Sequence, residues 1–95
     1  MVILRIEHKV PSFEGWKAAF DRDPIGRKKS GVRRYRICRA KDDPDYVIVD
    51  LEFDTSAQAE AALESLRSMW KQVEGKVMVK PQTRMLNVVE APNAD

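Results

Sequence analysis

Alternating apolar and polar residues predict four strands along the chain. The first segment alternates with a period of two, which is typical of a strand with one buried face. The second segment, VRRYRICRA, is basic, and the third, YVIVDLEF, carries acidic residues between its apolar ones. The fourth follows an irregular stretch around Pro81. The expected strands lie at residues 2–9, 32–40, 46–53 and 82–90.

A first helix is expected to open at Pro11 and Ser12, because apolar aromatic residues follow at helical spacing, at Phe13, Trp16 and Phe20. The dipeptide at 23–24, Asp-Pro, is typical of a new helix start. We therefore expect an interruption there, a short helical piece to about Lys29 and a left-handed stop at Gly31.

The second helix is expected to begin with a capping box between Thr55 and Gln58. Apolar residues then recur at helical spacing, at Ala59, Ala62, Leu63, Leu66, Met69, Trp70 and Val73. Gly75 is expected to end this helix. Residues 1–90 would form a single domain, and the polar tail at 91–95 is expected to be mobile.

This β-α-β-β-α-β order, with right-handed crossovers, predicts an α+β fold of the ferredoxin-like type. The antiparallel sheet would have the strand order 4-1-3-2, with both helices on one face. In the third strand, alternation sends four apolar residues toward the helices, namely Val47, Val49, Leu51 and Phe53. The other face of this strand would then show Tyr46, Ile48, Asp50 and Glu52.

The register of the central hairpin follows from a tight turn at Asp42, Asp43 and Pro44. If a three-residue turn pairs Lys41 with Asp45, directly opposed side chains form three pairs across the strands. These pairs are Arg36 with Asp50, Arg34 with Glu52, and Cys38 with Ile48. Tyr35 and Ile37 would point toward the helices.

The open sheet face would therefore carry a charged lattice of Arg5, Glu7, Arg34, Arg36, Asp50 and Glu52. Three interpretations remain open. The charges are ordinary residues of a solvated or subunit-facing sheet, or they line a polar site closed by a second subunit, where arginine suits a carboxylate or enolate. The third, nucleic-acid binding, is disfavoured because Tyr46 is the only aromatic residue on that face.

Composition supports one soluble domain, with 95 residues, 43% hydrophobic and 34% charged. The formal net charge of +2 hides twelve basic and four acidic residues in 1–41, against five and eleven in 42–95. The hairpin sets these halves against each other, so much of the asymmetry would be paired internally. A chain of this length buries only about 60–65% of its surface, so a second subunit would help it fold.

Several classes of function lack support in the sequence. No apolar run approaches the roughly 18 residues of a transmembrane helix, and we expect a cytoplasmic protein without membrane or nucleic-acid partners. The single cysteine, Cys38, excludes an internal disulfide and a Cys-rich zinc cluster. The scattered glycines offer no phosphate loop, and no zinc or hydrolase motif occurs. No cofactor or metal is expected.

A resemblance to a known family rests on three segments and a closing strand. The segments are HKV, FEGWKAAFDRDPIGRKKSGVRRYRICR and DDPDYVIVDLEFDTSAQAEAALESLRSMW. In this pattern the chain resembles small bacterial proteins of the dimeric α/β-barrel superfamily, nearest to the antibiotic biosynthesis monooxygenase-like group. The resemblance implies a homodimer whose open sheet faces meet, with a cavity between sheet and helices. Haem-degrading relatives use a histidine on the later helix, which this chain lacks.

The resemblance implies binding of a small molecule, with cofactor-independent monooxygenase or isomerase activity on an aromatic or polyketide-like compound. The alternative is a non-catalytic dimeric binding or stress-associated module. The oxygenases use Asn, Trp and Tyr side chains around their substrate, for which this chain offers Asn87, Trp16, Trp70 and Tyr35 by residue type.

Candidate catalytic residues are His8, Asp50 and Arg36. Candidate substrate-binding residues are Arg5, Arg34, Glu52, Tyr46, Trp16 and Trp70. In this hypothesis an arginine stabilises a substrate anion while His8 or Asp50 moves a proton. Trp16 and Trp70 belong to buried helix stripes, so they would pack in the core and line any cavity there. Asp23, Pro24, Gly26 and Arg27 could shape its mouth.

Overall fold

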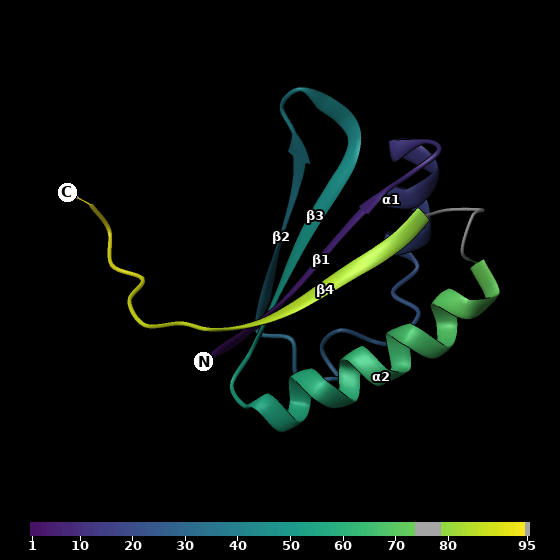
Figure 1. Cartoon of the computed structure of the whole chain (residues 1–95). Coiled ribbons are helices and arrows are strands. Elements are labelled where there is room, and N and C mark those ends of the chain that lie inside the picture. Colours follow the sequence, from purple (N-terminus) through teal and green to yellow (C-terminus); the bar gives the residue numbers. More distant parts are fainter. Residues whose placement is uncertain (74–78, 95) are drawn as a thin grey trace.

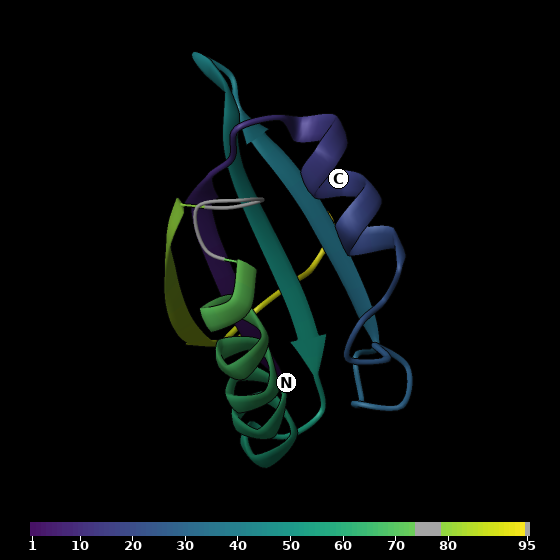
Figure 2. The same cartoon turned by 90° about the vertical axis from the view of Figure 1, so that its right-hand side faces the viewer.

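The computed structural model describes residues 1–73 and 79–94 and shows the expected β-α-β-β-α-β order. The elements are β1 (Val2–Lys9), α1 (Phe13–Asp21), β2 (Arg34–Ala40), β3 (Asp43–Phe53), α2 (Ser56–Val73) and β4 (Val79–Asn87). All strand pairs are antiparallel, in the order β2-β3-β1-β4. Both helices cover the same face of the sheet (Figure 1, Figure 2). The ferredoxin-like fold and its strand order are therefore confirmed.

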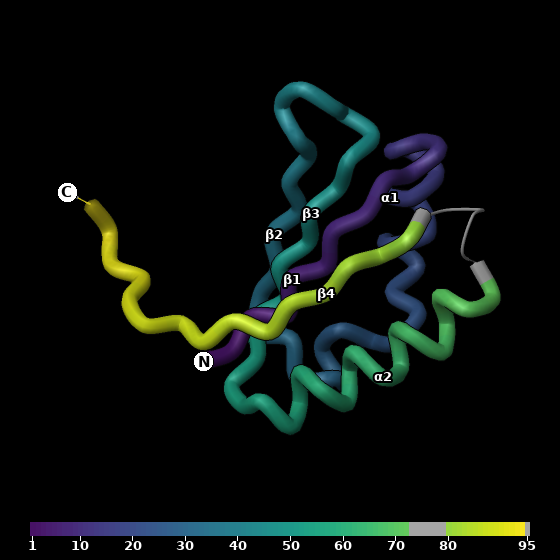
Figure 3. The backbone as a smooth tube through the Cα atoms, viewed as in Figure 1, coloured from purple at the N-terminus to yellow at the C-terminus, as the bar shows by residue number. Residues whose placement is uncertain are grey.

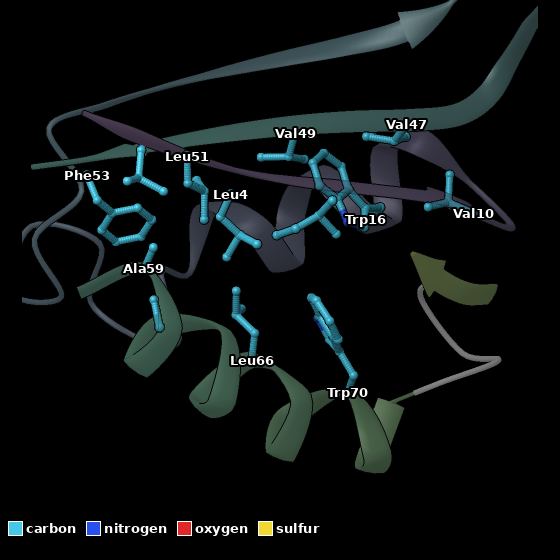
Figure 4. Close-up of a cluster of buried hydrophobic side chains, with 13 residues drawn as sticks. Leu4, Val10, Trp16, Val47, Val49, Leu51, Phe53, Ala59, Leu66 and Trp70 are labelled. Atoms are coloured by element: carbon cyan, nitrogen blue, oxygen red, sulfur yellow. The ribbon is translucent and has the colours of Figure 1, made fainter. Parts of the chain in front are cut away.

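The core lies between the sheet and the two helices. Alternation along β3 buries the expected residues, Val47, Val49, Leu51 and Phe53. Figure 4 shows these side chains facing the helices, with Leu66 and Trp70 projecting toward them from α2. Trp16 supplies the buried residue of α1. Burial of large apolar side chains, each contributing roughly 1.5–3 kcal/mol, holds the helices on this face.

Both helices begin where their capping residues predict. The Oγ of Ser12 accepts a hydrogen bond from the Gly15 amide at 3.2 Å. Thr55 and Gln58 form the reciprocal capping box, with distances of 3.2 and 3.3 Å between side-chain oxygens and backbone nitrogens. These bonds satisfy amides that have no partner within the helix. The expected end of α2 at Gly75 lies outside the described residues.

The short helix expected up to Lys29 is wrong. Turns fill the segment between α1 and β2, because Asp23 and Gly26 both adopt left-handed conformations, with φ of 54° and 66°. The Asp23 carboxylate accepts the Arg27 amide at 2.8 Å, which closes a loop where a helix would have continued. The left-handed conformation expected at Gly31 is confirmed, with φ of 96°.

The central hairpin turns more tightly than expected. Its turn is Lys41 and Asp42, and Asp43 already belongs to β3. Ala40 pairs with Asp43 after a bulge, so the expected pairing of Lys41 with Asp45 is wrong. The bulge makes up for the shorter turn, so the pairing from Arg34 to Arg39 keeps the expected register. The three expected cross-strand pairs are therefore confirmed, at Arg34–Glu52, Arg36–Asp50 and Cys38–Ile48.

Strand β4 begins and ends earlier than the expected 82–90. Pro81 lies inside β4, where the pairing with β1 is irregular between Glu7 and Lys9. A proline is tolerated there because β4 is an edge strand. Figure 3 shows the chain beyond β4 running away from the sheet, and its mobility stays a prediction. No helix among the described residues is long and apolar enough to cross a membrane.

Candidate functional site

The sheet separates the predicted site residues into two groups. Arg5, Arg34, Arg36, Tyr46, Asp50 and Glu52 lie on the open face, as their register and alternation require. His8, Trp16 and Trp70 lie on the face that the helices cover, and all three are buried. His8 therefore does not meet Asp50 or Arg36, and the three predicted catalytic residues do not form one site.

Asp50 is the centre of the open face. Arg5 donates two hydrogen bonds to its carboxylate, at 2.9 Å from Nε and 3.0 Å from Nη2. Arg36 donates a longer bond of 3.4 Å from the other side. Arg5, which has the larger effect, and Arg36 lower the pKa of Asp50, although the burial of Asp50 raises it. Asp50 is a paired anion and therefore a poor acceptor for a substrate proton.

The remaining carboxylates of the open face are also paired. Arg34 donates to Glu52 at 3.1 Å, and the Tyr46 hydroxyl donates to Glu7 at 3.1 Å. Burial, and secondly Glu7, raise the pKa of Tyr46. Cys38 is exposed in the same layer. This arrangement fits the interpretation in which the charges fix the register of the sheet.

Sequence reasoning missed the contribution of β4 to this face. Arg84 pairs in register with Arg5, so one row across the sheet reads Arg36, Asp50, Arg5 and Arg84. That row carries three arginines and one carboxylate. The alternation of β4 would have revealed Arg84 if the pairing of β4 with β1 had been assigned.

A partly open cavity of about 240 Å³ lies on the other side of the sheet, between it and the helices. Ile6, Val49 and Leu51 line it from the sheet, and Trp16 and Phe20 from α1. Residues of α2 complete the wall, namely Leu66, Met69 and Trp70. Trp16 and Trp70 thus both pack in the core and line the cavity, as the sequence indicated.

His8 is the polar residue that β1 contributes to this cavity. Its side chain is 2% exposed, and its ring centroid lies 5.6 Å from that of Trp16. Among the described residues its Nδ1 has no hydrogen-bond partner. Burial lowers the pKa of His8 from 6.5 to about 4, so the imidazole is neutral at pH 7. A buried nitrogen without a partner is an unused hydrogen-bonding group.

The segment between α1 and β2 lines the remaining side. Asp23, Pro24 and Arg27 contribute to the lining, and their role as the mouth stays a prediction, whereas Gly26 supplies the bend without lining the cavity. Arg22 and Ile25 also line it, and no pattern in the sequence pointed to either residue. Asn87 lies on β4, opposite Val2 and outside the lining.

No group of three or more potential metal ligands occurs among the residues that the structure describes. Within the cavity lining, His8 and Asp23 are the side chains of that kind. Two such groups from different elements do not make a site of the usual four-ligand type. The cavity is better suited to an organic ligand than to a metal ion.

No protein-family model and no curated protein matches the chain. Solved structures do resemble it. SnoaB, a cofactor-independent oxygenase from Streptomyces nogalater, has a TM-score of 0.72 and 10% identity, covering 95% of this chain and 94% of that chain. A dimeric ferredoxin-like protein from an uncultured marine organism has a TM-score of 0.67 and 16% identity, covering 96% and 97%.

A candidate antibiotic biosynthesis monooxygenase from Nitrosomonas europaea has a TM-score of 0.63 and 17% identity, covering 95% of this chain and 100% of that chain. At these identities the likeness establishes the fold. The structural neighbours are thus ferredoxin-like proteins of the monooxygenase-like kind that the sequence resembles, and some of them are dimeric.

The two arginines beside Asp50 are expected to differ in their coupling to it. Urea unfolding of Arg5→Gln, Arg36→Gln, Asp50→Asn and both double variants should give a coupling energy of about 1 kcal/mol for Arg5. Arg36 should couple less, because its contact is longer and its side chain is 71% exposed. Equal couplings would contradict the geometry.

His8 is expected to make stability depend on pH. Between pH 6.5 and about 4 the unfolded chain binds a proton that folded His8 does not, so stability falls as the pH falls through this window. From pH 7 to 4.5, wild type should lose about 2–3 kcal/mol more unfolding free energy than His8→Leu. Urea titrations at both pH values measure the difference, and parallel losses would show that His8 is not desolvated.

Proposed function

We propose that the chain is a homodimeric small-molecule-binding protein whose cavity takes an apolar aromatic or polyketide-like compound. The observation that carries this proposal is the cavity itself, with its apolar walls, two tryptophans and one unpaired imidazole nitrogen. Ligand pockets are commonly of this kind, with apolar linings and few polar groups. The charged open face is assigned to assembly.

The size of the cavity limits the ligand. An engineered apolar cavity of about 150 Å³ binds benzene. At about 240 Å³, this cavity has room for a second fused ring. The tilted rings of His8, Trp16 and Phe20 form one continuous aromatic wall, with centroid separations of 5.6 and 5.2 Å. Such a wall favours a flat aromatic compound over a flexible chain.

The reaction that we propose is a cofactor-independent oxidation, with isomerisation as the related possibility. In the oxidation a phenolic ring compound supplies the electrons, and dioxygen is the oxidant. One oxygen atom replaces two hydrogens at a ring CH₂ to give a carbonyl, and the other leaves as water. The fold shared with the oxygenase SnoaB supports this reaction class.

His8 would assist by accepting a proton from the ligand. Burial opposes the imidazolium, as the lowered pKa of His8 shows. Proton transfer is therefore favourable only when the anion left on the ligand stays beside the ring and stabilises the charge. The same lowered pKa favours the second candidate function, a non-catalytic binding module in which neutral His8 only hydrogen-bonds the ligand.

The homodimer would form through the open sheet face. This face also carries apolar residues from three strands, since Ile3 and Leu86 share a row with Glu52 and Ile48 lies opposite Glu7. Asp50 and Glu52 are already paired within the chain, so a second subunit would cover the face without leaving these carboxylates unpaired. Dimeric proteins among the structural neighbours support this assembly.

Ligand binding is expected to depend on the volume of the cavity. We expect 2-naphthalenemethanol to bind wild type in isothermal titration calorimetry. Ala19→Phe should weaken this binding at least tenfold, because Ala19 lines the cavity and the larger side chain fills it. Ala18→Phe, at an exposed position of the same helix, is the matched control and should bind normally. Absence of binding to wild type would overturn the proposal.

Dimerisation is expected to depend on Ile48. Ile48→Asp should raise the dimer dissociation constant at least tenfold in sedimentation equilibrium, because it places a carboxylate in the proposed interface beside Glu7. Ala18→Asp, on the exposed side of α1, should leave the dimer intact. A wild-type monomer at micromolar concentration would refute assembly through this face.

A further inference from the structure

The charged groups of the cavity are gathered at one place. Arg22, Asp23 and Arg27 all belong to the segment between α1 and β2, whereas the sheet and α2 contribute apolar side chains besides His8. Arg22 is exposed, so this segment is where the cavity reaches the surface. A ligand entering here meets two guanidinium groups and one carboxylate.

We propose that the ligand is an aromatic acid, whose carboxylate Arg27, helped by Arg22, binds at this mouth while its rings occupy the apolar cavity. This inference rests on the proposed function, because it names the chemical class of the compound that the same cavity takes. It makes Arg27 a specificity-determining residue.

Arg27 is held in place before any ligand arrives. Its side chain is 17% exposed, and its guanidinium carbon lies 4.1 Å from the ring centre of Phe20 and 4.8 Å from that of Tyr35. Nη1 donates to the Phe20 carbonyl at 2.8 Å. A guanidinium held against two aromatic rings loses little side-chain entropy when it binds an anion.

Asp23 engages only part of the Arg27 guanidinium. Its carboxylate accepts the Arg27 backbone amide at 2.8 Å, whereas the ion pair between Nη1 and Oδ1 is longer, at 3.4 Å. An arginine has five N–H donors in a planar fork. The described residues thus engage only part of the Arg27 fork, and a carboxylate could take further donors in the paired geometry that guanidinium favours.

The wall between Arg27 and His8 is aromatic along its length. The ring centroids of His8 and Trp16 are 5.6 Å apart, and those of Trp16 and Phe20 are 5.2 Å apart. The guanidinium carbon of Arg27 lies 4.1 Å from the ring centroid of Phe20. A cation and a neutral hydrogen-bonding ring therefore mark the two ends of one row of aromatic rings. This order suits a flat compound with an acid at one end and a hydroxyl or carbonyl at the other.

The surroundings of the mouth add positive potential. Arg27 and Asp23 also line an adjoining open groove, to which Lys28, Arg33 and Arg34 contribute. Asp54 is the other acidic residue of that groove. An excess of cations around an apolar opening raises the local concentration of anions and steers them to it.

The test compares two probes of the same shape, 2-naphthoate and the neutral 2-naphthalenemethanol, by isothermal titration calorimetry at pH 7. Wild type should bind the carboxylate at least tenfold more tightly. Arg27→Gln should weaken naphthoate binding at least tenfold and change binding of the alcohol less than threefold. Charge-assisted hydrogen bonds are strong enough to give tenfold changes in affinity.

Lys71→Gln is the matched control, because it removes one positive charge from an exposed position next to cavity-lining Trp70. It should keep the full preference for naphthoate. Should Arg27→Gln unfold, Arg22→Gln and the salt dependence of wild type decide, since both should weaken naphthoate binding selectively.

Equal affinity for both probes, or an equal loss of both in Arg27→Gln, would overturn the inference and leave the proposed function standing. If the alcohol bound wild type and naphthoate did not, the inference alone would be overturned. If neither probe bound wild type, the inference and the proposed function would both be overturned.

Discussion

Asp50 is a carboxylate buried in the middle of a sheet, and it can stay charged there only because arginines from both neighbouring strands reach it. Arg5 on β1 and Arg36 on β2 approach it at 2.9 and 3.4 Å. A shift of either strand by one residue would turn its arginine to the other face and remove one of the two partners of the carboxylate. One acidic side chain thus ties three strands to one register, and that register decides which residues meet the helices.

The same register separates polar side chains that have hydrogen-bond partners, on the open face, from one that lacks a partner, on the helix-covered face. On the open face, Glu7, Asp50 and Glu52 all have partners within the chain. Across the sheet, the cavity holds His8, whose Nδ1 is unpaired among the described residues. Groups that already have partners bring little to a ligand, whereas an unpaired buried nitrogen gains by binding one. Chemistry is therefore better placed in the cavity than on the charged face.

The sequence predicted most of the fold because its signals were local. Alternation in β3 and the capping box at Thr55 each depend on residues close in the chain. It failed at 23–29, where left-handed Asp23 and Gly26 replaced a helix, since a helix start and a turn share the Asp-Pro signal. The catalytic candidates were chosen by residue type, which does not reveal which face of a sheet a side chain occupies. The alternation of β1 places His8 on the same face as Leu4 and Ile6, and combining this alternation with residue type separates His8 from Asp50.

The cavity's apolar character and the low pKa of His8 have one cause, which is the exclusion of water by Trp16 and its neighbours. Desolvation penalises any lone charge in this space, so a ligand anion and an imidazolium are each unfavourable alone and favourable together. At the mouth this cost is smaller for a ligand anion, because solvent is near and the Arg27 guanidinium is already fixed there to pair with it.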